Sequence, residues 1–173
     1  MAKSNTGIRG VAHLALYDEN GDLKLEVVKN NLITTHGDEY YAKQAIAGVD
    51  GNTAPTLVAG MQLGTGTTPA AKSGAASTIE TFIANSGVAF DPGSVDPSAV
   101  GSDVGWKVRY TCTWGAGVAT NSAITEAVIT EQTDGNTPAV ASDTISRVVF
   151  TAINKGASDT LVLNWDHIFY DAV

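Results

Sequence analysis

The first strong pattern is an alternation of apolar and polar residues near the start of the chain. Residues 8–17 and 22–29 both alternate, and successive side chains of a strand point to opposite faces. Asp18-Glu19-Asn20-Gly21 lies between them, and Asn-Gly is typical of a type I′ turn. Residues 8–29 are therefore predicted to form a β-hairpin, with one apolar face made by Ile8, Ala12, Leu14, Leu16, Leu23, Leu25 and Val27.

The second half of the chain carries the most regular alternation. Residues 104–114 predict a long strand, and residues 123–131, 144–153 and 160–170 predict three more. Glycine-, asparagine- and serine-rich turns separate them. The first of these strands is predicted to bury one face, made by Trp106, Val108, Tyr110, Cys112 and Trp114.

The middle of the chain is less regular. Residues 37–47 predict a short helix that starts near Thr35 and Asp38, ends at Gly48, and faces the sheet with Tyr41, Ala45 and Ile46. Residues 57–63 predict a strand, and residues 80–90 fit either a helical turn or a strand anchored by Phe82, Ile83, Val88 and Phe90. Two stretches rich in small residues, 64–78 and 91–103, predict long surface loops, the first fixed by neighbouring subunits.

These elements predict one mainly β domain over residues 1–173, an antiparallel β-sandwich or jelly-roll-like fold with one short helix and long loops. The hairpin at 8–29 could serve as an anchoring or exchanged element. Glu126 and Arg147 lie on neighbouring predicted strands and are expected to pair. The predicted core is Leu14, Leu25, Leu63, Val108, Tyr110, Val149, Phe150, Leu163 and Trp165.

Composition agrees with a β-rich fold and narrows the partners. The 173 residues include 20 Thr, 17 Val and 10 Ile against 9 Leu, and β-branched residues favour strands. Eighteen acidic against ten basic residues give a net charge of −8, which disfavours nucleic acids and anionic membranes. The chain lacks an apolar run long enough to span a membrane, and its first residues predict no secretion signal.

Histidines and acids offer weak candidates for chemistry. His13, His36 and His167 each lie apart from other metal-ligating residues in the sequence. Asp166 and His167 are adjacent on a predicted strand, so they should point to opposite faces and cannot act as an acid–base pair. We therefore assign no catalytic residue and predict a protein that is not an enzyme.

Two loop patterns suggest ligand binding and are weaker still. Gly64-Thr65-Gly66-Thr67-Thr68 lacks the Gly-Lys-Ser/Thr and helix of a phosphate-binding loop. Asp18, Asn20 and Asp22 have calcium-loop spacing, but Leu23 and Lys29 occupy the positions where an EF-hand needs Gly and Glu. A loop calcium site using Asp91, Asp96 or Asp103 stays an open alternative. No cofactor and no metal is assigned.

Cysteine and aromatic residues on residues 104–114 have two interpretations. Cys112 is the single cysteine, so no intrachain disulfide forms, and its place between Tyr110 and Trp114 predicts a buried, inert thiol. Trp106, Tyr110 and Trp114 lie in phase on one long strand, four residues apart, which favours a core face. If that face were exposed, the three rings would form a platform for sugar stacking.

Short motifs then follow one another over residues 30–170: Asn31-Leu32-Ile33-Thr34, residues 61–69 (MQLGTGTTP), residues 124–127 (ITEA), Arg147-Val148-Val149-Phe150, Ile153-Asn154-Lys155 and residues 161–165 (LVLNW). This succession resembles small virion structural proteins of tailed bacteriophages, in the head-decoration, head-fibre and tail-accessory group. The resemblance points to a class of protein, and the N-terminal hairpin is less typical of it.

The resemblance implies a non-enzymatic structural component of the virion, assembled in the host cytoplasm. Its leading form is a capsid decoration, or cement, protein that binds at capsomer junctions through loops 64–78 and 91–103 and its termini. The implied partners are the major capsid protein or other virion proteins, and copies of itself, for example as a trimer. The alternative is a carbohydrate- or receptor-binding module on a tail, collar or fibre.

Overall fold

The structure is a computed structural model that describes residues 7–100, 105–132 and 134–170. It is mainly β, as predicted, with one α-helix among these residues. The elements in chain order are β1 (Gly7–Tyr17), β2 (Leu23–Ile33), α1 (Thr35–Ala45), β3 (Gly60–Gly64), a 3₁₀ turn (Ala75–Ser77), β4 (Val88–Ala89), β5 (Asp96–Ala99), β6 (Trp106–Trp114), β7 (Asn121–Thr130), β8 (Thr144–Lys155) and β9 (Thr160–Tyr170).

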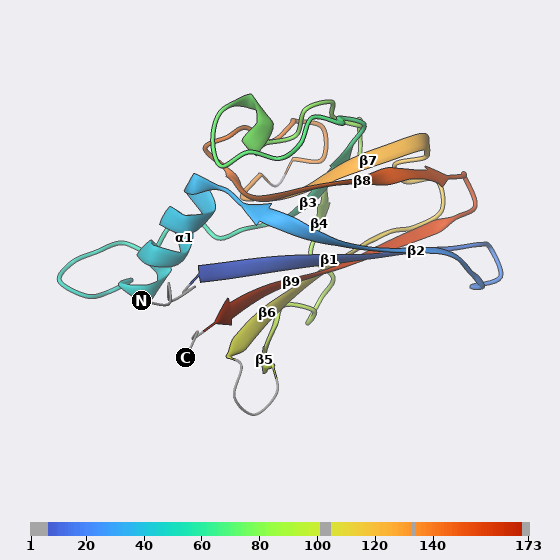
Figure 1. Ribbon diagram of the computed structural model, residues 1–173. Helices are drawn as coiled ribbons and strands as arrows, with labels where there is room; N and C mark the ends of the chain where they lie inside the picture. The colour runs from blue at the N-terminus through green and yellow to red at the C-terminus, as the bar shows by residue number, and fades with distance from the viewer. Residues whose placement is uncertain (1–6, 101–104, 133, 171–173) are drawn as a thin grey trace, which may run out of the picture.

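The described strands form one antiparallel sheet in the order β4-β3-β7-β8-β2-β1-β9-β6-β5. The sheet curls into a half-barrel (Figure 1), and the expected sandwich or jelly roll is not confirmed. The junction between β2 and β8 is short, because these long strands pair only at Leu32–Arg147 and Ile33–Ser146. We call β2, β1, β9, β6 and β5 the β1 half, and β4, β3, β7 and β8 the β7 half.

The two halves approach again at the opposite side, where β4 lies against β6. The Cys112 thiol donates to the Ala89 carbonyl at 3.4 Å, and the Trp114 indole N–H donates to the Ser86 carbonyl at 2.6 Å. Cys112 is fully buried, and burial raises the pKa of its thiol far above the usual value. This confirms the prediction of a buried cysteine, whose thiol stays protonated.

Most of the predicted core is buried between the two halves. Leu14, Leu63, Tyr110, Phe150, Leu163 and Trp165 are buried, and Val108 and Val149 are half-buried. Leu25 is wrong as a core residue, because it is 38% exposed. Its strand β2 pairs with β8 only at Leu32 and Ile33, so no strand of the β7 half pairs with β2 at Leu25.

The β1–β2 hairpin is confirmed, with register pairs from Gly10–Asn31 to Tyr17–Leu23. The turn differs from the predicted type I′, because only Gly21 has a positive φ, of 86°. Gly21 N–H donates to the Asp18 carbonyl, and the Asp18 carboxylate accepts from the N–H groups of Asn20 and Asp22. An aspartate that fixes its own turn explains the spacing first compared with a calcium loop.

Helix α1 begins two residues earlier than predicted. Thr34, not Thr35, is the N-cap: its hydroxyl accepts from Gly37 N–H at 2.9 Å and donates to the Thr144 carbonyl at 2.6 Å. The helix contacts the sheet through Tyr40 and Tyr41. Ala45 and Ile46, which we expected to face the sheet, are exposed.

The middle of the chain contains more regular secondary structure than the sequence predicts. The strand predicted at 57–63 is β3, shifted so that Leu57 lies outside it and is 68% exposed. Residues 80–90 contain the short strand β4, and the predicted loop 91–103 contains β5, which pairs with β6. No helix within the described residues is long and apolar enough to cross a membrane.

The contrast between Leu14 and Leu25 gives a direct stability test. Leu14→Ala should lower the free energy of unfolding by about 2–5 kcal/mol, because it leaves a cavity between the two halves. Leu25→Ala should lower it by about 1 kcal/mol or less, because that side chain is already partly in water. Chemical denaturation of both variants measures this difference, and equal losses would contradict the open position of β2.

Candidate functional site

A fully buried ion pair lies on the outer face of the β7 half. Arg147 on β8 and Glu126 on β7 are fully buried, and Arg147 Nη2 lies 2.9 Å from Glu126 Oε2. The strand register places Glu126 opposite Val149 and Arg147 opposite Val128, so the two side chains are diagonal neighbours on one face. The pairing predicted from the sequence is confirmed.

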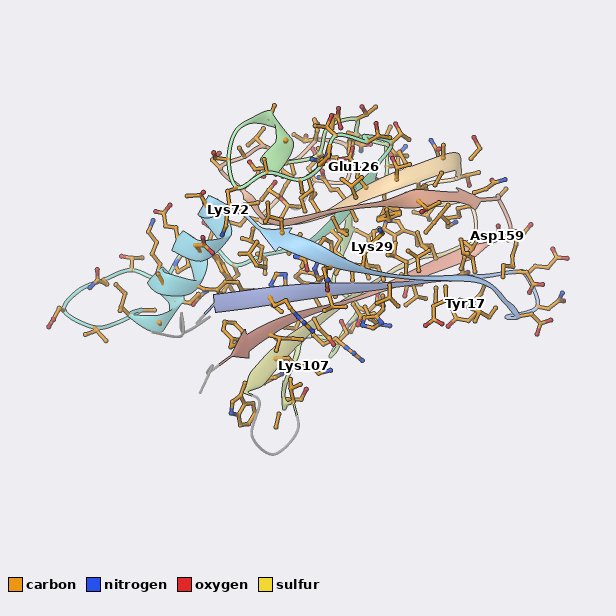
Figure 2. All side chains as sticks on the ribbon, viewed as in Figure 1. Tyr17, Lys29, Lys72, Lys107, Glu126 and Asp159 are labelled. Atoms are coloured by element: carbon orange, nitrogen blue, oxygen red, sulfur yellow. The ribbon has the colours of Figure 1, made fainter. Side chains whose placement is uncertain are left out.

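This ion pair fixes residues 65–81, which we call the covering segment, over β7 and β8. Glu126 Oε1 accepts from the N–H groups of Gly66 at 2.8 Å and Thr81 at 2.9 Å. Arg147 Nη1 donates to the Ala76 carbonyl at 2.9 Å. Figure 2 shows Glu126 on the side of β7 that faces the covering segment.

Glu80 and Thr68 extend the network. Arg147 Nη2 lies 3.3 Å from Glu80 Oε2, and Glu80 accepts in turn from the hydroxyl and N–H of Thr68. A Cβ atom at Gly66 would overlap the Glu126 carboxylate, so a glycine is required there. The sequence suggested that neighbouring subunits hold this loop. The structure shows that contacts within the chain already fix its inner side.

A groove opens beside the network, where β2 separates from β8. It has a volume of about 400 Å³ and is lined by Asn30, Asn31, Leu32, Thr67, Pro69, Ala70, Arg147, Val148 and Val149. Its one charged lining residue, Arg147, already donates to Glu126 and Ala76. The groove therefore presents amide, hydroxyl and aliphatic groups and no free general acid, base or nucleophile.

A second polar cluster lies under helix α1. His167 on β9 is fully buried, and its Nδ1 lies 2.5 Å from the Tyr41 hydroxyl, which is 3.2 Å from the Tyr110 hydroxyl. Burial lowers the pKa of His167 to about 3 and raises the pKa of Tyr110 to about 12. All three groups are therefore neutral near pH 7, and they join the helix to the β1 half.

Asp166 lies on the opposite face of β9 from His167, as the alternation predicts. It forms ion pairs with Lys107 at 3.0 Å and Arg109 at 2.6 Å, both on β6. Burial alone would raise the pKa of Asp166, but the hydrogen bonds from Arg109 and Lys107 outweigh it and hold the pKa below the usual value. Asp166 and His167 share no contact that could transfer a proton.

The other sequence candidates lie apart from one another. His13 lies half-buried on β1, and His36 at the start of α1 pairs with Glu131 at 2.9 Å. No cluster of three or more metal-ligating side chains occurs in the described ranges. Asp91 accepts from the Thr113 hydroxyl, while Asp103 and the side chain of Asp96 lie outside the described part of the chain.

The three aromatics of β6 do not form an exposed platform. Tyr110 is 4% exposed and Trp114 is fully buried, which confirms their core interpretation. Trp106 is 61% exposed, so its expected place in the core is wrong. It begins β6 and pairs with Phe169 of β9, beyond the reach of the β7 half.

Sequence reasoning missed the connections made by Tyr41, Glu80 and Lys155. Lys155 ends β8 fully buried, donates to the Gly115 carbonyl at 2.9 Å, and has its pKa lowered by that burial. A signal was present for Lys155, because a charged residue in phase with apolar strand positions must find a buried partner. Nothing local indicated that Tyr41 would meet His167, which lies 126 residues later.

Removal of the two glutamates that contact Arg147 should lower the stability by unequal amounts. Glu126→Ala leaves the Arg147 cation and several N–H groups buried without an acceptor, so it should cost about 3–5 kcal/mol of stability. Glu80→Ala removes a partly exposed partner of the same arginine and should cost far less. Urea denaturation of both variants measures this, and similar losses would show that Glu126 does not organise the segment.

The buried histidine predicts a pH dependence. The unfolded chain protonates histidine near pH 6.5, whereas folded His167 resists protonation until about pH 3. The unfolded state thus binds more protons between these values, and stability should fall as the pH is lowered, by up to about 1.4 kcal/mol per pH unit. Most carboxylates with lowered pKa act below about pH 5, so denaturation is measured between pH 5 and 6.5, and the difference between the parent and His167→Gln gives the contribution of His167. His167→Gln should flatten the slope, and an unchanged slope would refute this assignment.

Comparisons of the chain and its structure with protein-family models, curated proteins and solved structures give no match.

Proposed function

We propose that the chain is a non-enzymatic structural subunit of a tailed-bacteriophage particle, and within that class a capsid decoration protein. The structural part of this proposal rests on one observation, that the buried charged side chains hold segments of the chain together. Glu126, Arg147, Lys155 and Asp166 each bind another segment of the same chain. An enzyme needs several polar groups that converge on a space for substrate.

The groove supports the same proposal. Its volume of about 400 Å³ could hold a small ligand, but its lining offers no reactive group. The neutral His167–Tyr41–Tyr110 cluster is closed beneath α1, and burial keeps its groups from exchanging protons near neutral pH. Both features favour rigidity over catalysis. The placement on a phage particle rests on the resemblance of the sequence motifs.

The covering segment supplies a surface suited to docking. Its inner side is fixed by Glu126 and Arg147, whereas residues 67–69 and 72–75 are exposed. Lys72 pairs with Asp38 at the start of α1, which steadies this side of the segment. A fixed loop loses little conformational entropy on binding. Weak contacts repeated over the capsid shell would therefore together give stable attachment.

The first test is binding to particles assembled without the protein. Purified chain should co-sediment with them, and imaging should place its density over the icosahedral shell. Ser73→Arg, in the exposed part of the covering segment, should reduce the bound amount about tenfold through lost contacts. Asn20→Arg, in the exposed hairpin turn, is the matched control and should bind like the parent.

Other outcomes would redirect the proposal. Density confined to the portal vertex, tail or fibre would overturn the capsid location and favour the receptor- or carbohydrate-binding alternative, for which the exposed Trp106 ring is the specific observation. Equal binding of Ser73→Arg and the parent would contradict docking through the covering segment. Absence of the chain from purified particles would contradict a virion role altogether.

A further inference from the structure

The edge of β2 that faces away from β1 is open over most of its length. Its ladder with β8 stops at Leu32–Arg147, and the groove separates Asn30 from Val149 beyond that point. Within the described residues, no backbone hydrogen bond joins β2 between Leu23 and Asn31 to any strand other than β1. Such an edge is a template for another strand.

The register identifies which backbone groups are open. Thr34 N–H donates to the Ile145 carbonyl, so even-numbered residues of β2 direct their N–H and C=O groups away from β1. A register shift between Leu25 and Leu23 disturbs this alternation near the turn. The open edge therefore consists of Glu26, Val28 and Asn30, whose backbone groups face outward.

Between Leu25 and Asn31 the side chains of this edge offer little obstacle to pairing, and Lys24 and the register shift lie beyond that stretch, at the turn. Val28 is 53% exposed and Leu25 is 38% exposed, although both are apolar. The stretch from Leu25 to Asn31 contains no proline or glycine, and Lys29 is its one basic residue. Edges that avoid association usually carry prolines, bulges or several lysines.

We propose that this edge binds the same edge of a second copy of the chain, antiparallel about a two-fold axis at Val28. In this register Val28 lies opposite Val28, and Glu26 of each copy lies opposite Asn30 of the other. It is the two-fold register in which the three open residues pair with one another. A symmetric contact of this kind closes on itself as a dimer.

Side-chain chemistry selects the same register. The Asn30 amide can donate to the Glu26 carboxylate on each side of a central Val28–Val28 contact. An axis at Glu26 would place two carboxylates opposite each other. An axis at Asn30 would place the open residue Val28 opposite Leu32, which β8 already pairs. The axis at Val28 places only Lys24 there, so the pairing ends at Leu25 and the hairpin turn bends away from β8. Lys29 falls opposite Val27, so the Val28 register places no like charges directly opposite.

The contact is short, so the dimer should be weak in solution and stronger where copies are held side by side. A stable interface usually buries more than about 1,000 Å², which a seven-residue strand pair does not supply alone. Neighbouring copies on a surface raise the effective concentration and compensate. The inference goes beyond the proposed function, since the pair would form with or without a particle.

Disulfide trapping tests the axis. Val28→Cys places two thiols directly opposite, with Cα atoms about 5.5 Å apart, inside the range for a disulfide. Cys112 is buried and does not compete. Under mild oxidation Val28→Cys should give at least about tenfold more covalent dimer than Val140→Cys, because only its thiols meet this geometry. Val140 is the matched control, with the same exposure of 53%.

Register is tested by a second set of variants. Glu26→Cys alone should not cross-link, because its two copies are about four residues apart along the strands, or roughly 13 Å. The double variant Glu26→Cys/Asn30→Cys should cross-link through two disulfides. Equal trapping of Val28→Cys and Val140→Cys, with both thiols open to a labelling reagent, would overturn the dimer. Cross-linking of Glu26→Cys alone would overturn the register.

Sedimentation of proteins without added cysteine completes the test. The parent chain should show dimer that increases with concentration, and Val28→Lys should abolish it by placing two cations together at the axis. Val140→Lys should behave like the parent. A parent chain that stays monomeric at all concentrations, or a dimer that survives Val28→Lys, would refute the inference.

Discussion

The buried pair of Glu126 and Arg147 determines the form of the β7 half. Two charges removed from water are tolerated only if nearly every donor and acceptor on them is satisfied. Neighbouring strands cannot do this, because their backbone groups are used in the ladder. The missing partners come from the covering segment, through the N–H groups of Gly66 and Thr81 and the carbonyl of Ala76. One electrostatic requirement therefore orders a stretch with little apolar area of its own.

The same requirement makes the two halves of the sheet unequal. The β7 half is covered on its outer face, so Arg147 and Val148 are both buried although they point to opposite sides. The β1 half keeps a solvent-facing outer side, where Asp166 is paired with Lys107 and Arg109. The β7 half thus contains a fully buried ion pair that holds the covering segment, whereas the ion pairs of the β1 half are partly exposed.

Sequence alternation predicted the strands well because the period of a strand is a local property. It also predicted the pairing of Glu126 with Arg147, because the two residues lie on neighbouring predicted strands. It failed at Leu25 because alternation identifies a face and does not show where the opposing strand ends. It placed the helix cap at Thr35 instead of Thr34 because adjacent threonines are equivalent until the contact with Thr144 selects one. The groove and the Tyr41–His167 contact depend on pairing between distant segments, for which the sequence has no local signal.

The long reach of the ion network has a consequence for folding kinetics. Glu126 binds N–H groups 45 and 60 positions earlier in the chain, and these contacts form only after the intervening chain is ordered. The β7–β8 pair joins strands close in sequence and can assemble first, with its charges still hydrated. Closure of residues 65–81 then removes that water in a late step. Folding should consequently be slow for a chain of this length, and the last region to gain protection from hydrogen exchange should be the covering segment.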